Sequence, residues 1–164
     1  MKLAESVIKY LTENQLTLVT AESCTAGQIL ALLGKYDGCG QCLDLGYVVY
    51  SCESKKRVLK VKQETIDCFT LTSEEVAHEM AMGALSRSQA NLAIATTGIT
   101  GSEPMDGIEP GTVCFAWGYQ QGKKIIIRKE TRLFKGSRKQ MQHRAACYAL
   151  KQLILFHKAI ASPH

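Results

Sequence analysis

The sequence contains no apolar run of 18 residues, so it predicts no membrane-spanning helix and no membrane partner. Its first residues, Met1–Ser6, lack the continuous apolar segment of a signal peptide. Seven cysteines, an odd number, accompany this lack of an export signal. Thiols in such chains usually stay reduced inside the cell. We therefore expect a cytoplasmic protein.

Repeats, low-complexity tracts and linkers are also lacking. Apolar residues make up 46% of the 164 residues and charged residues 21%, which is the balance of ordinary globular proteins. A chain of this length can bury a substantial core. We therefore expect one domain over residues 1–164.

Metal-ligand spacing is missing apart from one pair of thiols. Cys39 and Cys42 are spaced as C-x-x-C, but a structural zinc site needs four ligands and no second pair occurs. The four histidines show no ligand spacing either. We predict no metal and no other cofactor. The two thiols are interpreted as part of an ordinary loop, with an oxidisable dithiol as the alternative.

The net charge of +5 is modest and comes partly from a basic run, Lys55–Lys62. No aromatic residues interleave with this run and no nucleic-acid module is recognisable. We therefore predict no nucleic-acid partner. A small anionic ligand fits the charge equally well.

Helical and strand patterns alternate along the chain until a late hairpin. The predicted helices cover 2–14, 25–34, 51–61, a segment that begins after Thr72–Glu75, and 137–158. The predicted strands cover 16–20, 45–50, 92–97, 112–117 and 124–128. This order is typical of an α/β fold, and we expect a three-layer α/β/α domain with a mixed, mostly parallel sheet.

Three predicted strands end in polar turns: Ala21–Gly27, Tyr50–Lys55 and Thr97–Gly101. Ligands of such folds bind beyond the carboxyl ends of the strands, so we expect the three turns to converge. Ser23 could make the first turn a nucleophile turn. However, the turn lacks the G-x-S-x-G pattern, and no histidine is placed to activate a serine. We favour ligand positioning, with capping of the following helix as the alternative.

Six motifs follow one another along nearly the whole chain. They are AESCTAG at 21–27, YSCESK at 50–55, TSEEVAHEMAMGA at 72–84, TGITG at 97–101, PGTV at 110–113 and FKGSR at 134–138. In the same order, they resemble AESCTGG, YSNEAK, VSEEVAxEMAxGA, TGIAG, PVGTV and FPGDR of the CinA C-terminal-domain family. This is the competence/damage-inducible protein family, whose active members are nicotinamide mononucleotide deamidases.

The resemblance implies a stand-alone and commonly oligomeric α/β/α domain. It also implies hydrolysis of the nicotinamide amide to the acid, without a metal and with release of ammonia. The implied catalytic set is a serine helped by a tyrosine and a lysine, which match Tyr50 and Lys55. Without the resemblance, Lys55 would count as one of several exposed basic residues. The serine position, ten residues before the tyrosine, is Gly40 in this chain. Cys39 is the substitute nucleophile that we consider.

The turns and the resemblance together suggest a set of substrate-binding residues. The set is Glu22, Ser23, Thr25, Gly27, Thr97, Gly98, Gly101, Gly111, Thr112 and Arg138. Arg138 lies near a helix start, where it could bind phosphate or simply be solvated. Ala26 replaces a glycine of the family motif, which could remove a conformation with positive φ.

Gly40 supplies no nucleophile, and losing a nucleophile costs on the order of 10⁶-fold in rate in a well-studied hydrolase. We therefore expect a homo-oligomer whose pocket binds a pyridine nucleotide such as nicotinamide mononucleotide, with weak or no deamidase activity. One alternative is an active amidohydrolase that uses Cys39. The other is a non-catalytic interaction or regulatory protein.

Overall fold

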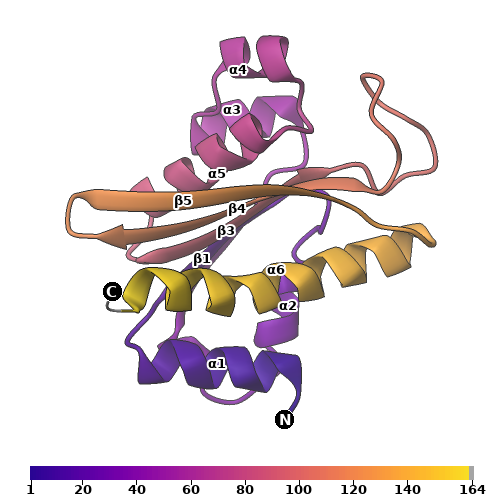
Figure 1. The fold of residues 1–164 in the computed structure, drawn as a ribbon. Coiled ribbons are helices and arrows are strands. Elements are labelled where there is room, and N and C mark those ends of the chain that lie inside the picture. Colours follow the sequence, from indigo (N-terminus) through magenta and orange to yellow (C-terminus); the bar gives the residue numbers. More distant parts are fainter. Residues whose placement is uncertain (163–164) are drawn as a thin grey trace.

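In the computed structural model, which describes residues 1–162, a five-stranded sheet lies between two layers of helices (Figure 1). The strands are β1 (Leu18–Glu22), β2 (Leu43–Val48), β3 (Leu92–Gly98), β4 (Thr112–Gln121) and β5 (Lys124–Leu133). The helices are α1 (Leu3–Glu13), α2 (Gln28–Leu33), α3 (Cys52–Leu59), α4 (Gln63–Phe69), α5 (Glu74–Ser86) and α6 (Arg138–Ala161). A short 3₁₀ turn, Cys39–Gln41, precedes β2. Within residues 1–162, no helix combines the length and the apolar character that crossing a membrane requires.

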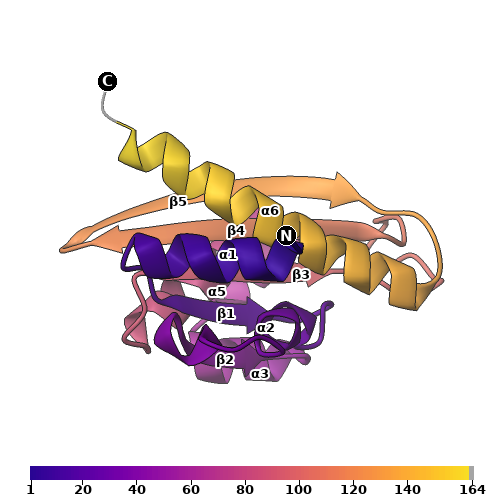
Figure 2. The same ribbon diagram turned by 90° about the horizontal axis from the view of Figure 1, so that it is seen from below.

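The strand order is β2-β1-β3-β4-β5, so β2 and β5 are the two edges (Figure 2). Strand β1 pairs in parallel with β2 and β3, whereas the β3–β4 and β4–β5 pairs are antiparallel. The α/β class and the mixed sheet are confirmed, but the expectation of a mostly parallel sheet is corrected. The loop between β3 and β4 carries no crossover helix, and without one β4 returns antiparallel to β3.

Helices cover both faces of the sheet, and each layer buries its own apolar cluster. Helices α3, α4 and α5 lie on one side, and α1, α2 and α6 lie on the other (Figure 1). Three helices begin where a serine side chain accepts a hydrogen bond from a backbone amide of the first turn: Ser51 for α3, Ser73 for α5 and Ser137 for α6. These caps fix where the helices start, and two of the starts adjoin the candidate site.

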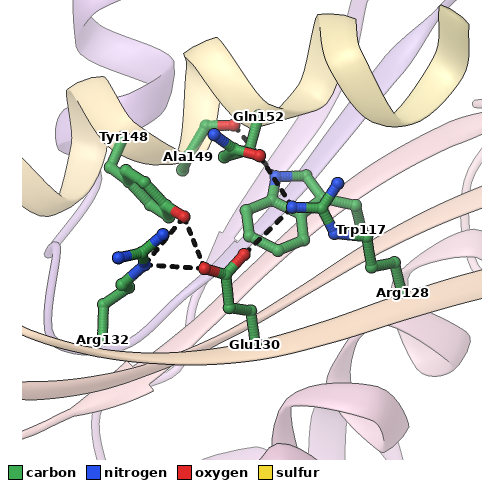
Figure 3. Close-up of polar contacts among 7 residues, drawn as sticks. All are labelled: Trp117, Arg128, Glu130, Arg132, Tyr148, Ala149 and Gln152. Carbon is green, nitrogen blue, oxygen red and sulfur yellow. Dashed lines mark hydrogen bonds and ion pairs between the residues drawn. The ribbon is translucent and has the colours of Figure 1, made fainter. Parts of the chain in front are cut away.

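A polar network fastens α6 to the β4–β5 hairpin (Figure 3). The Trp117 indole donates to the Ala149 carbonyl oxygen at 2.9 Å. The Glu130 carboxylate on β5 accepts from Arg132 at 2.6 Å and from the Tyr148 hydroxyl at 2.5 Å. The Arg132 guanidinium also lies over the Tyr148 ring, 5.0 Å from its centre. Because α6 is held along its length, the residues at its N-terminal end have a fixed place beside the sheet.

Candidate active site

The three polar turns meet at the carboxyl edge of the sheet. They line a cavity of about 400 Å³, within the size range of small-molecule sites. The first turn contributes Ser23 and Cys24, and the second contributes Tyr50 and Lys55. The remaining wall consists mainly of the segment 97–103, with Arg138 from α6. We call this space the Lys55 cavity.

Ser23 and Lys55 are in direct contact inside this cavity. The Lys55 amine lies 2.9 Å from the Ser23 hydroxyl oxygen, and both residues are buried. Ser23 directly follows β1, and its backbone amide donates to the Thr96 carbonyl oxygen at 3.1 Å. Its own carbonyl oxygen accepts from the Ala26 amide at 3.0 Å. The serine backbone is therefore fixed on both sides, and its side chain faces the amine.

Lys55 is only 2% exposed, although the sequence around it is basic. Burial lowers the pKa of its amine from the ordinary value, while the nearby thiols of Cys24 and Cys52 act in the opposite direction. The amine also donates to the carbonyl oxygens of Val49 at 3.0 Å and Tyr50 at 3.1 Å. A neutral amine has two N–H groups and one lone pair. It could donate to both carbonyls and still accept the serine proton, which is the arrangement that a general base requires.

Tyr50 is 55% exposed and lies at the mouth of the Lys55 cavity. The Arg138 guanidinium donates to its phenol oxygen at 2.6 Å. The structure therefore brings Tyr50, Lys55 and Arg138 to the same cavity. The Tyr50 atom within hydrogen-bond distance of Lys55 is its backbone carbonyl oxygen.

A second cavity of about 580 Å³ continues from the first. The two share Thr100, Gly101, Ser102 and Arg138, so Arg138 stands at their boundary. The second space also contains Lys135 at the start of α6, and we call it the Lys135 cavity. Together the cavities could hold a ligand whose polar core lies near Ser23 and whose anionic end lies near Lys135.

Cys24 lies in the Lys55 cavity, but its chemistry differs from that of a reactive cysteine. The side chain is buried, and burial raises the pKa of the thiol to about 12. The thiolate is the nucleophilic form of cysteine, and a thiol with this pKa stays protonated at neutral pH. Cys24 therefore serves as a wall of the cavity.

Glu22 and Thr25 belong to the internal structure of the first turn. The fully buried Glu22 carboxylate accepts from the Thr25 hydroxyl at 2.6 Å. It also accepts from the backbone amides of Ile29 at 3.0 Å and Leu30 at 3.3 Å, at the N-terminus of α2. A carboxylate there satisfies amides that the helix leaves unpaired. Neither Glu22 nor Thr25 lines the Lys55 cavity.

Ala26 and Gly27 complete this turn with left-handed backbone conformations. Their φ angles are +51° and +89°. The positive φ that the family glycine would favour is therefore kept at Ala26, at the steric expense of a side chain. Gly27 precedes α2 and does not line the cavity.

Thr97, Gly98 and Gly101 line the Lys55 cavity. The Thr97 hydroxyl donates to the Leu71 carbonyl oxygen at 2.9 Å, which ties β3 to the segment before α5. A Cβ atom added at Gly101 would lie 3.6 Å from a terminal nitrogen of Arg138. The glycine thus leaves the guanidinium close to the turn.

Gly111 and Thr112 lie outside the Lys55 cavity. The Gly111 amide donates to the Ile99 carbonyl oxygen at 2.6 Å, and the Thr112 amide donates to the Glu109 carbonyl oxygen at 3.2 Å. These bonds close the loop between β3 and β4. The two residues therefore shape the cavity wall without reaching into it.

Cys39 and Gly40 lie at the N-terminal end of β2, at the opposite end of this strand from the Lys55 cavity. The 3₁₀ turn that contains them comes before β2, whereas Tyr50 and Lys55 come after it. Next to this turn, the Cys42 carbonyl oxygen accepts from the amide of Leu18, the first residue of β1. A six-residue strand is about 20 Å long. Within one copy of the chain, neither Cys39 nor Gly40 can therefore contact Lys55.

The sequence motifs missed part of the cavity lining. Leu71, Ser102, Glu103 and Met105 also line the Lys55 cavity. Leu71 and Ser102 directly adjoin motif residues, and that proximity was the only available signal. Among residues 1–162, no group of three or more His, Cys, Asp or Glu side chains could hold a metal ion.

Comparisons with known proteins agree with this architecture. The family model described as the CinA C-terminal domain matches residues 1–156. The nicotinamide-nucleotide amidohydrolase PncC of Escherichia coli K12 is 35% identical over 154 residues, which are 93% of this chain and 92% of that protein. The solved structure of the competence or damage-inducible protein from Enterobacter asburiae has a TM-score of 0.89 and 35% identity. That match covers 94% of this chain and 95% of the other.

Other relatives are much longer. A CinA-like protein of Chlorobium limicola is 35% identical over 163 residues, which are 98% of this chain but only 38% of that protein. The chain spans between 36% and 38% of the length of three such relatives from Clostridium tetani and two Chlorobium species.

Proposed function

Because the chain belongs to the CinA C-terminal domain family, we propose that it hydrolyses the carboxamide of a nicotinamide nucleotide. Ser23 is the nucleophile and Lys55 is its base. The substrate class comes from the amidohydrolase of Escherichia coli that this chain resembles over most of both lengths. The assignment of the nucleophile comes from the site itself.

One observation carries this proposal. The Ser23 hydroxyl oxygen lies 2.9 Å from a buried lysine amine whose pKa is lowered by burial. A serine needs an adjacent base to become a nucleophile, and a desolvated lysine can fill that role without a histidine. The contact lies in a cavity large enough for a small molecule.

The chemistry divides into two steps. In the first, the neutral Lys55 amine takes the Ser23 hydroxyl proton while Oγ bonds to the carboxamide carbon. The lysine then returns the proton to the leaving nitrogen, which departs as ammonia and leaves an ester on Ser23. In the second, Lys55 takes a proton from water, the hydroxide attacks the ester, and Ser23 regains its proton. The products are the free enzyme and the nicotinate form of the nucleotide.

The substrate's phosphate is assigned to the Lys135 cavity. Lys135 and Arg138 supply positive charge there, and guanidinium and ammonium groups are common phosphate ligands. The nicotinamide ring would then occupy the Lys55 cavity, with its carboxamide facing Ser23.

A second candidate function is binding of the nucleotide without hydrolysis. It is favoured by Gly40, which provides no side chain at the position of the family's implied serine. Hydrolysis by Cys39 would require a second copy of the chain, because Cys39 and Lys55 lie at opposite ends of β2. A homo-oligomer, which the family resemblance implies, remains a prediction.

Ammonia release from nicotinamide mononucleotide tests these proposals. We expect turnover in the unaltered protein and a large loss in Ser23→Ala, of up to about 10⁶-fold, the scale seen when a hydrolytic serine is removed. Cys39→Ala and Ser6→Ala, a half-buried serine on α1, are the matched controls and should keep the rate, because neither residue lines the Lys55 cavity. A normal rate in Ser23→Ala would overturn the role of Ser23. No turnover in the unaltered protein, with a gain in Gly40→Ser, would favour binding without hydrolysis.

A further inference from the structure

Tyr50 contacts the two charged residues of the site through different atoms. Its backbone carbonyl oxygen accepts from the Lys55 amine at 3.1 Å. Its phenol oxygen accepts from the Arg138 guanidinium at 2.6 Å. The contact with the base therefore needs no particular side chain at position 50, whereas the contact with Arg138 needs the hydroxyl.

Among the described residues, Arg138 forms no ion pair within 4.0 Å, although Glu103 lines the same cavity. Among residues 1–162, the ion pairs involve other side chains, and the hydrogen bond found for the Arg138 guanidinium is the one to Tyr50. A neutral phenol uses one of the five N–H groups of a guanidinium and leaves the others available. An anion is a stronger partner for them than a phenol is.

Arg138 also lies where its guanidinium can reach a ligand in either cavity. The residue lines both cavities, and one of its terminal nitrogens lies next to Gly101. The other terminal nitrogen donates to the Tyr50 phenol oxygen, which holds that side of the guanidinium. A planar group held in this way can present two N–H groups to a phosphate with little loss of side-chain entropy.

We propose that Tyr50 is a positioning residue that fixes Arg138, and that this pair makes the site selective for nicotinamide nucleotides that carry a phosphate monoester. This inference rests on the proposed function, and it assigns Tyr50 a role in positioning Arg138 in place of the catalytic help that the family resemblance implies. The phenol acts on binding of the phosphate through Arg138, and the amide chemistry belongs to Ser23 and Lys55.

The test measures binding in the Ser23→Ala background, so that hydrolysis does not consume the ligand. Calorimetric titrations compare nicotinamide mononucleotide with nicotinamide riboside, which lacks only the phosphate. We expect Arg138→Gln to weaken the mononucleotide roughly ten- to hundredfold, as loss of a charge-assisted hydrogen bond does. Tyr50→Phe should weaken it roughly three- to tenfold, and the affinity for the riboside should change little in either variant.

Two comparisons isolate the role of Tyr50. In the Arg138→Gln background, Tyr50→Phe should have no further effect, because the residue that it positions is gone. Tyr47→Phe is the matched control, since this nearby phenol donates to the Arg87 carbonyl oxygen away from the cavity. It should leave both affinities unchanged.

Kinetics with Ser23 intact separate positioning from proton transfer. A positioning role predicts that Tyr50→Phe raises KM for the mononucleotide, whereas a proton-transfer role predicts a fall in kcat with both ligands. If binding depends on Tyr50 and Arg138 as described but no ammonia is released, the inference stands and the proposed hydrolysis fails. Three outcomes would overturn the inference. The preference for the mononucleotide over the riboside could be equal in all variants, the effects of the two substitutions could be additive, or the mononucleotide could fail to bind.

Discussion

Replacing Lys55 with Met tests whether burial has lowered the pKa of this amine. Methionine keeps a long flexible stem in the same space and carries no charge. In the unfolded chain the amine regains water and its ordinary pKa of 10.5, whereas in the native protein the pKa lies below that value. Between the two pKa values the unfolded chain holds a proton that the native protein has released. The free energy of unfolding of the unaltered protein therefore rises with pH across that interval.

The size of this effect follows from the surroundings of the amine. One group can contribute at most about 1.4 kcal/mol per pH unit. The substitution also removes three hydrogen bonds of 2.9 to 3.1 Å at every pH. The buried Ser23 hydroxyl and Val49 carbonyl would each lose a partner, at about 1–3 kcal/mol per group. The variant no longer buries a charged amine, and this gain in the free energy of unfolding opposes that loss. The variant thus differs from the unaltered protein by a constant offset plus a pH-dependent part, and only the second part reports the pKa.

Urea unfolding under reducing conditions, from about pH 6.5 to about pH 9.5, measures the difference directly. The free energy of unfolding of the unaltered protein minus that of Lys55→Met should increase with pH. Lys56→Met is the control, because Lys56 is on the same helix and pairs with the exposed Glu53 at 2.7 Å; its difference should stay flat over this range. A flat or falling difference for Lys55 would show that the native pKa does not fall within this range, and it would refute Lys55 as a base near neutral pH.

Three further substitutions test the supports of the site by chemical denaturation. Glu22→Gln should lower the free energy of unfolding by about 2–4 kcal/mol, because an amide cannot accept all the hydrogen bonds that the buried carboxylate accepts; an unchanged midpoint would contradict this role. Ala26→Gly should raise the free energy of unfolding by about 1 kcal/mol, because φ is +51° at this position. A lower free energy of unfolding would show that the turn tolerates alanine without strain. Gly83→Ala should lower it by about 1–3 kcal/mol, because the added Cβ would overlap the Leu59 carbonyl oxygen and push α3 from α5. Ammonia release should fall with it, since α3 carries Lys55, and a neutral result would mean that the helices can separate freely.

Helices and strands with a clear local signal, such as a capping residue or an apolar run, could be predicted from the sequence. The starts predicted at residue 51, near Thr72–Glu75 and at residue 137 agree with α3, α5 and α6, each of which begins at a serine cap. Apolar and β-branched runs located β3 and the β4–β5 hairpin. Helix α4 (Gln63–Phe69) was missed because it is a short helix without a side-chain cap. Strand β1 begins two residues later than predicted, because hydrophobicity at Leu16 reflects burial against α1 and not strand pairing.

The candidate site was less accessible to sequence reasoning than the fold was. The three turns could be predicted to converge, because strand direction alone decides that. The contact between Ser23 and Lys55 could not, because it joins residues 32 positions apart and depends on how α3 turns back over β1. The basic run suggested an exposed face for Lys55, and only tertiary packing buries this one amine. Glu22 was expected to bind substrate, since a carboxylate that caps the next helix has the same sequence pattern as one that faces a ligand.

These placements change what Gly40 implies for activity. A nucleophile at position 40 and the lysine at position 55 lie at opposite ends of β2, about 20 Å apart along that strand. A serine there could use Lys55 only if a neighbouring copy of the chain brought it in. A side chain at position 40 would therefore matter only for a contact between copies, and its absence leaves the contact inside each copy intact. Ser23 contacts Lys55 whatever residue occupies position 40, so the hydrolysis that we propose for the isolated fold depends on that pair. If Gly40→Ser raised the rate while Ser23→Ala left it unchanged, the reacting serine would have to come from the neighbouring copy.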